Sequence, residues 1–259
     1  MAILKSKPKY KTFDGYIDNP DGGAVITYRK MYKEMYINKF NTVLLRESGN
    51  INYTIYEKSG KDESFIFHFK IPSEVIPNFY YDVVVELYKV DGNNNLRSYG
   101  VRFFSNDPAF TFTHARAFRK NNLLFSDVTI KLNPETLKKE SKVRNPEDRI
   151  FYVKSIYFAY LTMEKYNLFN RANVLSKAVK YNKNTLLENI QPADIVLQRR
   201  TELANKLSKE KEEEKKTKTN TRRPTDKDTK ISTVSKVSKI TKSRSNTKSI
   251  RNTKTTKKK

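Results

Sequence analysis

The last 45 residues, 215–259, cannot join a packed core, and they limit the folded part of the chain to its first 214 residues. This segment holds 17 of the 52 Lys and Arg residues against two acids, which gives it +15 of the net charge of +24. It has no aromatic residue, no Gly and only five aliphatic residues. Such a composition buries too little apolar surface to offset the loss of chain entropy. The sequence therefore predicts a disordered polybasic tail at 215–259.

The remaining 214 residues are enough to bury a substantial hydrophobic core. The chain contains no Cys, which excludes disulfides and thiolate metal sites. No apolar run approaches the roughly 20 residues that cross a membrane, and the apolar stretch at the N-terminus is too short for a secretory signal. We therefore expect no membrane partner, and a protein that stays in the cell that makes it or enters a particle assembled there.

Alternating apolar residues and tight turns between residues 50 and 132 predict an antiparallel β-sheet. Phe65, Phe67 and Phe69 share one face of a predicted strand, with His68 and Lys70 on the other face. Tight connections such as the turn-rich segment 91–95 indicate a meander or a sandwich. Further strands are expected at 51–57, 82–90, 96–104, 109–118 and 123–132.

The predicted strand at 109–118 places Phe110, Phe112, His114 and Phe118 on one face. A row of aromatic rings could stack on nucleic-acid bases, but an RNA-binding sheet sets Gly and basic residues among its aromatics. The segment 110–114 lacks that pattern. We therefore expect these phenylalanines in the core.

Helical spacing of apolar residues flanks the β region on both sides. A short amphipathic helix is expected at about 25–40. After Pro134, Asn145 is expected to cap a helix that begins at Pro146. Shorter helices are expected at 171–181 and 185–190, and a final helix from Pro192 whose apolar stripe is Val196, Leu203 and Leu207.

The fold class predicted from these patterns is α+β. A short helix precedes an antiparallel β meander or sandwich, a helical region follows, and a disordered basic tail ends the chain. The chain should divide into an N-terminal arm at 1–24, a mainly antiparallel β domain with its short helix at 25–135, a helical region at 136–214 and the tail at 215–259.

Catalytic and metal-binding patterns do not emerge from the sequence. The two histidines, His68 and His114, lack ligand spacing, and we expect His114 to be a hydrogen-bonded core residue. Gly60-Lys61 does not form a phosphate-binding loop, because Ile55 stands where the motif needs a Gly. Asp14, Asp18 and Asp21 lie near turn residues that do not match a calcium loop. We therefore expect no enzymatic activity, no metal and no cofactor.

The basic tail is the strongest candidate for a binding function. Its charge is concentrated and nearly of one sign, which predicts a flexible arm that neutralises phosphates. No side chain in it can stack on a base, so base-specific recognition is not expected. The alternative is a tail that only increases solubility. The residues expected to bind nucleic acid or an acidic partner are Lys215, Lys216, Lys218, Arg222, Arg223, Lys236, Lys239, Lys242, Arg244, Lys248, Arg251, Lys254, Lys257, Lys258 and Lys259.

Four short motifs stand out between about residues 26 and 170. They are Lys70-Ile-Pro-Ser-Glu74, Tyr81-Asp-Val-Val-Val85, Phe104-Ser-Asn-Asp-Pro-Ala-Phe-Thr-Phe-Thr113, and Val143-Arg-Asn-Pro-Glu147 before a Tyr-rich helix. This part of the chain resembles proteins encoded by tailed bacteriophages of low-G+C hosts, a family described as structural or hypothetical. The resemblance implies a role in the virion or in particle assembly. It supplies no catalytic residue, and the tail lies outside it.

The expected function is that of a non-enzymatic virion structural or assembly protein of the capsid, neck or tail, assembled in the host cytoplasm. Its expected partners are other virion proteins, in a symmetric homo-oligomer, and packaged DNA or an acidic surface contacted by the tail. The alternative is an intracellular accessory protein that binds nucleic acid without sequence specificity during replication or packaging.

Overall fold

The computed structural model describes residues 10–19, 26–60, 63–90, 92–138, 145 and 147–220, with the backbone alone at 26–32 and 215–220. The chain divides into two units, Met1–Glu214 and Lys215–Lys259. The expected tail beyond Asn220 lies outside the described residues. Residues 215–220, expected at the start of that tail, instead continue the last helix. The fold is α+β, as the sequence predicts.

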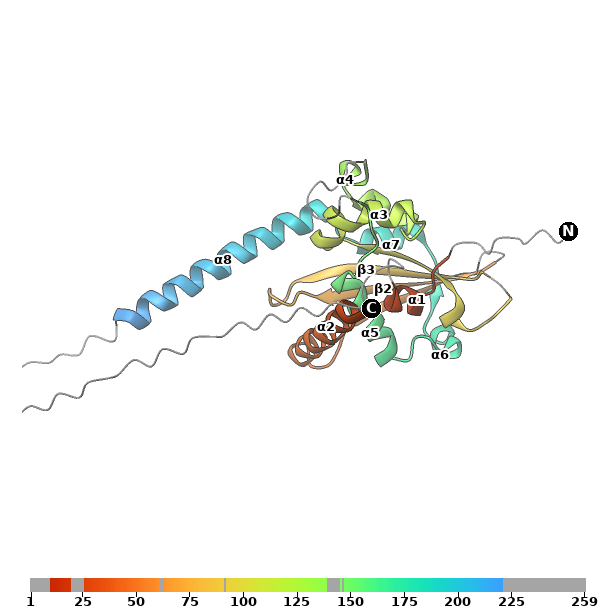
Figure 1. The fold of residues 1–259 in the computed structure, drawn as a ribbon, viewed down its shortest axis with the longest axis horizontal. Helices are drawn as coiled ribbons and strands as arrows, with labels where there is room; N and C mark the ends of the chain where they lie inside the picture. Colours follow the sequence, from red (N-terminus) through yellow and green to blue (C-terminus); the bar gives the residue numbers. More distant parts are fainter. Residues whose placement is uncertain are drawn as a thin grey trace, which may run out of the picture. The chain divides into compact units, whose positions relative to one another are not determined.

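A five-stranded sheet forms the centre of the first unit (Figure 1). Four strands make the predicted antiparallel meander, and a short fifth strand adds to β1 in parallel, in the order β4-β3-β2-β1-β5. The strands are β1 (Asn52–Lys58), β2 (Ser64–Pro72), β3 (Tyr80–Tyr88), β4 (Gly100–Ser105) and β5 (Val179–Lys180).

Helices cover both faces of this sheet. Figure 1 shows α1 (Phe13–Asp18), α2 (Ile26–Arg46) and α5 (Lys154–Lys165) on one side, with α3 (Ala115–Lys120) and α7 (Lys183–Asn189) on the other. Strand β2 is consequently buried along nearly its whole length, on both faces. The prediction that Phe65, Phe67 and Phe69 belong to the core is confirmed.

Other segments of the chain pair with the two outer strands of the meander, β4 and β1. Along β4, the backbone N of Val101 donates to Lys11 O at 2.8 Å, and that of Phe103 donates to Leu123 O at 2.7 Å. At the opposite edge, Tyr181 N donates to Glu57 O at 2.9 Å. These bonds occupy backbone groups that an exposed edge would offer to other strands.

The prediction of a strand at 109–118 is wrong. Residues Phe110–His114 form a single π-helical turn, η2, which runs directly into α3. Phe110, His114 and Phe118 are four residues apart, a spacing that fits one face of a helix as well as one face of a strand. Phe110 and Phe118 are buried as predicted, whereas the ring of Phe112 is 40% exposed on the other side of the helix. The prediction that Phe112 belongs to the core is therefore wrong.

The strand predicted at 123–132 is also absent. Leu124 makes one parallel bridge to Phe103, and Ser126–Lys131 form a 3₁₀ helix, η3. The bridge lies along the outer edge of β4, where Phe103 N donates to Leu123 O at 2.7 Å and Phe125 N donates to Phe103 O at 2.9 Å.

The helix expected from residue 146 begins later, at Lys154. Asn145 does not cap it. The buried amide of Asn145 donates to Thr113 O at 3.1 Å and Arg149 O at 2.9 Å, and accepts from Arg149 N at 2.9 Å. Asn145 thus satisfies the backbone of an irregular segment, and α5 starts after Val153 with no side-chain cap.

Part of the expected N-terminal arm belongs to the folded body. Thr12 caps α1, and Phe13 and Tyr16 of that helix are buried. The ring of Phe13 meets that of Phe103 at a centroid distance of 5.0 Å, and Tyr16 OH donates to Phe151 O at 2.9 Å. Residues 10–19 therefore contribute to the core, while residues 1–9 and 20–25 lie outside the described ranges.

The remaining elements are short, apart from the last helix, α8 (Ala193–Asn220). Its predicted stripe is confirmed, because Val196, Leu203 and Leu207 pack against Ile76 and Phe79. Within the described ranges, no helix combines the length and apolar character needed to cross a membrane. The other short elements are η1 (Leu96–Ser98), α4 (Pro134–Lys138) and α6 (Arg171–Leu175).

Candidate functional site

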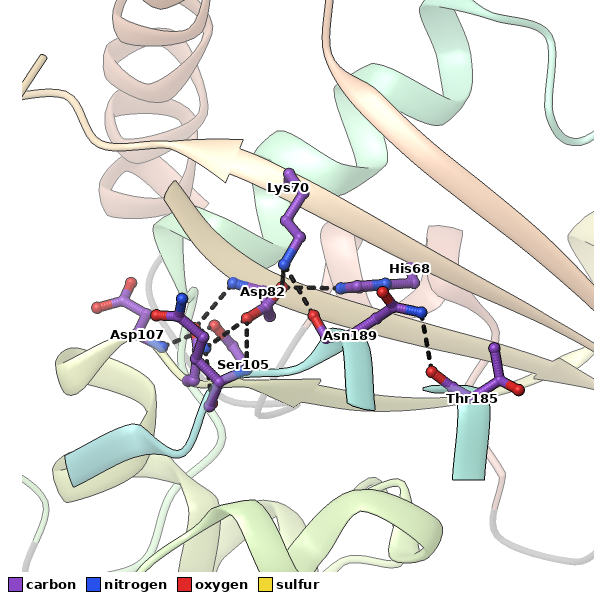
Figure 2. A network of polar contacts seen from close by, with 9 residues as sticks. His68, Lys70, Asp82, Ser105, Asp107, Thr185 and Asn189 are labelled. Atoms are coloured by element: carbon purple, nitrogen blue, oxygen red, sulfur yellow. Dashed lines mark hydrogen bonds and ion pairs between the residues drawn. The ribbon is translucent and has the colours of Figure 1, made fainter. Parts of the chain in front are cut away.

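A buried carboxylate, that of Asp82, is the centre of a polar network on the sheet (Figure 2). Asp82 of β3 pairs with Lys70 of β2, so the alternation of side chains places His68 and Lys70 on its own face. The carboxylate accepts four hydrogen bonds, from Lys70 Nζ, from His68 Nε2 at 2.8 Å, from Asn106 Nδ2 at 2.8 Å and from Gln191 N at 3.1 Å. The predicted position of His68 on a sheet face beside Lys70 is confirmed.

These donors keep Asp82 ionised. Its side chain is 3% exposed, and burial by itself acts to raise the pKa of a carboxyl group. The hydrogen bonds and charges of His68 and Lys70 outweigh that effect, and the pKa of Asp82 lies below its ordinary value. The carboxylate of Asp82 is therefore a buried, hydrogen-bonded charge, whereas the side chain of Lys70 is 38% exposed.

The network fastens the connection between α7 and α8 to the sheet. Lys70 Nζ donates to Asn189 O at 2.8 Å, and Asn106 Nδ2 donates to Gln191 O at 3.0 Å. The amide of Asn189 in turn donates to Thr185 O at 2.8 Å, within α7 (Figure 2). Loss of Asp82 would remove the acceptor that β2, the residue after β4 and the connection between α7 and α8 have in common.

A carboxylate bonded to an imidazole also occurs in enzymes, where the histidine activates a nucleophile. Among the described residues, no Ser or Thr hydroxyl is hydrogen-bonded to His68. The same part of the chain holds no group of three metal-binding side chains. The chemistry that the described geometry supports is a clamp between the sheet and the last two helices.

A second site lies beside Asp107, at the end of β4. Asp107 N donates to Ser105 Oγ at 3.1 Å, and its carboxyl oxygen accepts from Ala109 N at 3.0 Å. The residue is 8% exposed, and burial raises the pKa of its carboxyl group. Asp107 lines an open hollow of about 780 Å³. The other residues that line this hollow, called the Asp107 hollow below, include Met35, Tyr36, Lys39, Tyr81, Phe112, His114, Tyr152, Lys154, Leu197 and Arg200.

His114, which lines the Asp107 hollow, does not have all the hydrogen bonds that we expected of a core histidine. Its Nδ1 atom is buried and has no hydrogen-bond partner within the described part of the chain. Burial lowers the pKa of His114 to about 4, so the ring is neutral at pH 7. The expectation of a hydrogen-bonded core histidine is therefore wrong for Nδ1, which is shielded from solvent and unpaired among the described residues.

Three cationic side chains surround the same hollow. Lys39 of α2 and Lys154 of α5 share one acid, Glu74, at 3.0 and 2.9 Å. Arg200 of α8 is exposed. Sequence reasoning missed this cluster because its members come from segments far apart in the chain, and no local spacing connects them.

The binding residues predicted in the tail are not tested by the structure. Lys215, Lys216 and Lys218 lie in the last turns of α8, where the backbone alone is described, and those from Arg222 to Lys259 lie outside the described residues. No family model, curated protein or solved structure matches this chain.

Proposed function

We propose that this chain is a non-enzymatic structural or assembly component of a bacteriophage particle, in its capsid, neck or tail. Its C-terminal region binds packaged DNA or an acidic surface of another particle protein, and the body assembles with other virion proteins as a homo-oligomer. The observation that carries this proposal is the concentration of +15 charges in residues 215–259, out of +24 in the whole chain. The bacteriophage assignment rests on the motif resemblance between about residues 26 and 170.

The end of α8 supports a role for the C-terminal region outside the core. The helix packs on the body as far as Leu207, and from Ser208 to Glu214 every side chain is exposed. Lys206 lies 4.0 Å from Glu210, one turn later, a pairing that helps an isolated helix in water. A helix that is polar on all sides is typical of a spacer. The polybasic segment thus follows a stretch that makes no contribution to the core.

The alternative function is an intracellular accessory protein that binds nucleic acid without sequence specificity during replication or packaging. The same charge distribution favours it. Genes for portal, capsid and tail proteins on either side of the coding sequence would favour the virion component instead.

Deletion of residues 215–259 is expected to remove most of the affinity for DNA at low salt and to leave the fold of the body intact. Phosphate contacts release counterions, so the logarithm of the binding constant should fall linearly with the logarithm of the salt concentration. If six or more cations engage, affinity drops on the order of 10³-fold between about 50 and 200 mM salt. A titration of both proteins with two DNA sequences across a salt series measures this.

Equal affinity for the two DNA sequences is part of the expected result, because the segment cannot stack on bases. If the truncated protein binds as tightly as the full chain, the body with its net +9 is the binding element. If neither protein binds at low salt, the partner is an acidic protein surface.

A further inference from the structure

An exposed aromatic ring, that of Phe112, lies on the wall of the Asp107 hollow. Met35, 37% exposed, lines the same hollow. Large apolar side chains that gather at a solvent-open depression indicate a binding surface. Because the ring of Phe112 is exposed and not part of the core, it can stack on a flat ligand.

The charge around the hollow favours an anion. Lys39, Lys154 and Arg200 face two acids, Glu74 and Asp107, so the cations exceed the acids by one even with both acids ionised. Helix α5, with 12 residues, begins at the hollow with no side-chain cap and no acid in its first turn. The N–H groups and dipole at a helix start add to the attraction for an anion.

Two polar residues, His114 and Asp107, line the inner part of the hollow. A nucleobase presents both donors and acceptors at its edge and can meet such groups. The volume of about 780 Å³ falls within the range of roughly 300–1,000 Å³ usual for small-molecule sites.

We propose that the Asp107 hollow binds a nucleotide unit. The base stacks on Phe112, its edge meets His114 and Asp107, and its phosphate lies among the three cations. A free mononucleotide and one nucleotide of a bound single strand share this chemistry. The inference goes beyond the proposed function, because the site is on the body and contacts a base, whereas the C-terminal segment can only neutralise phosphates.

The test uses the full-length protein and 2-aminopurine deoxyribonucleoside monophosphate, whose fluorescence is quenched when its base stacks. The chain contains no Trp, so the emission of the probe is easily separated from that of the protein. At about 200 mM salt, the contribution of the polybasic segment is small. Phe112→Leu should weaken binding about tenfold or more, given the usual strength of base stacking. Arg200→Gln should also weaken it about tenfold, because it removes a charged contact to the phosphate.

Two variants are the matched controls. Arg199→Gln removes the neighbouring exposed guanidinium, which lines a different hollow of about 280 Å³, and should leave binding within about twofold of the original. Phe112→Tyr keeps an aromatic ring and should retain the quenching. Melting curves of all variants check that the fold is unchanged, as expected for exposed positions.

A second arm uses oligothymidylate with one internal 2-aminopurine. Quenching of this probe alone, dependent on Phe112, assigns the hollow to a single strand, and quenching of the monophosphate assigns it to a free nucleotide. Three results would overturn the proposal: no quenching of either probe, equal losses with Arg199→Gln and Arg200→Gln, or quenching that survives Phe112→Leu. Binding of an acidic peptide in place of both probes would also overturn it. The quenching results report stacking on Phe112 and not charge neutralisation by residues 215–259, and acidic-peptide binding counts only if Arg200→Gln removes it. The proposed function therefore stands or falls separately.

Discussion

Replacing Asp82 with Ala is expected to lower the free energy of unfolding by about 2–4 kcal/mol at pH 7, because it leaves the buried donors of His68 and Asn106 without their acceptor. The matched control is Asp18→Ala. Asp18 pairs with Lys33 at 2.7 Å but is 75% exposed, and surface pairs contribute at most about 1 kcal/mol. Urea denaturation of the two variants measures the contrast. Similar small losses would show that the carboxylate of Asp82 is hydrated rather than buried in the network.

The contribution of Asp82 should also depend on pH in a defined direction. Its pKa in the folded state lies below the ordinary 3.8, because His68 and Lys70 stabilise the charged form. The folded state therefore binds fewer protons than the unfolded state near pH 4, and stability is lost as the pH falls through the folded pKa. The difference between the original protein and Asp82→Ala should persist down to pH 5 and should shrink below about pH 4 as Asp82 takes up its proton. A difference that closes between pH 7 and 5 would contradict this assignment.

Replacing Phe110 with Ala is expected to cost about 3–5 kcal/mol, since the ring is fully buried and packs on Phe118 at a centroid distance of 5.2 Å. Phe112→Ala, two residues away, is expected to cost less than about 1 kcal/mol, because its ring is exposed. For a body of this size, the first change should lower Tm by roughly 6–20 °C. Thermal unfolding of the pair distinguishes the helical turn from a strand, in which both rings would be buried and both variants destabilised.

The sequence predicts the meander well, because each of its strands combines alternation with a turn at its end. It cannot distinguish strand from helix at 110–118, where the decisive apolar residues are four apart and satisfy both periods. Strand β5 has two residues, Val179 and Lys180, and is too short to produce a pattern. Asn145 and Pro146 resemble a helix start, yet the side chain of Asn145 instead makes a tertiary hydrogen bond to Thr113 O and a local one to Arg149 O.

The candidate sites were largely invisible in the sequence. Asp82 stands out as an acid in a Val-rich strand, but its partner Asn106 is 24 residues away and Gln191 is 109 residues away. The Asp107 hollow draws on α2, η2, α5 and α8, so it exists only after the helices pack on the sheet. The polybasic segment, in contrast, is visible in the sequence, because neutralising phosphates requires concentrated positive charge and no folded geometry.

The most direct test of the central claim, that this chain is a particle component, is quantitative mass spectrometry of purified, nuclease-treated particles of the bacteriophage that encodes it. We expect the chain at a fixed ratio to the portal or major capsid protein, and we expect this ratio to be unchanged between preparations and through a density gradient. Its absence from such particles, or a trace that declines with each purification step while the chain is abundant in the infected-cell lysate, would contradict the claim and favour the accessory nucleic-acid-binding role.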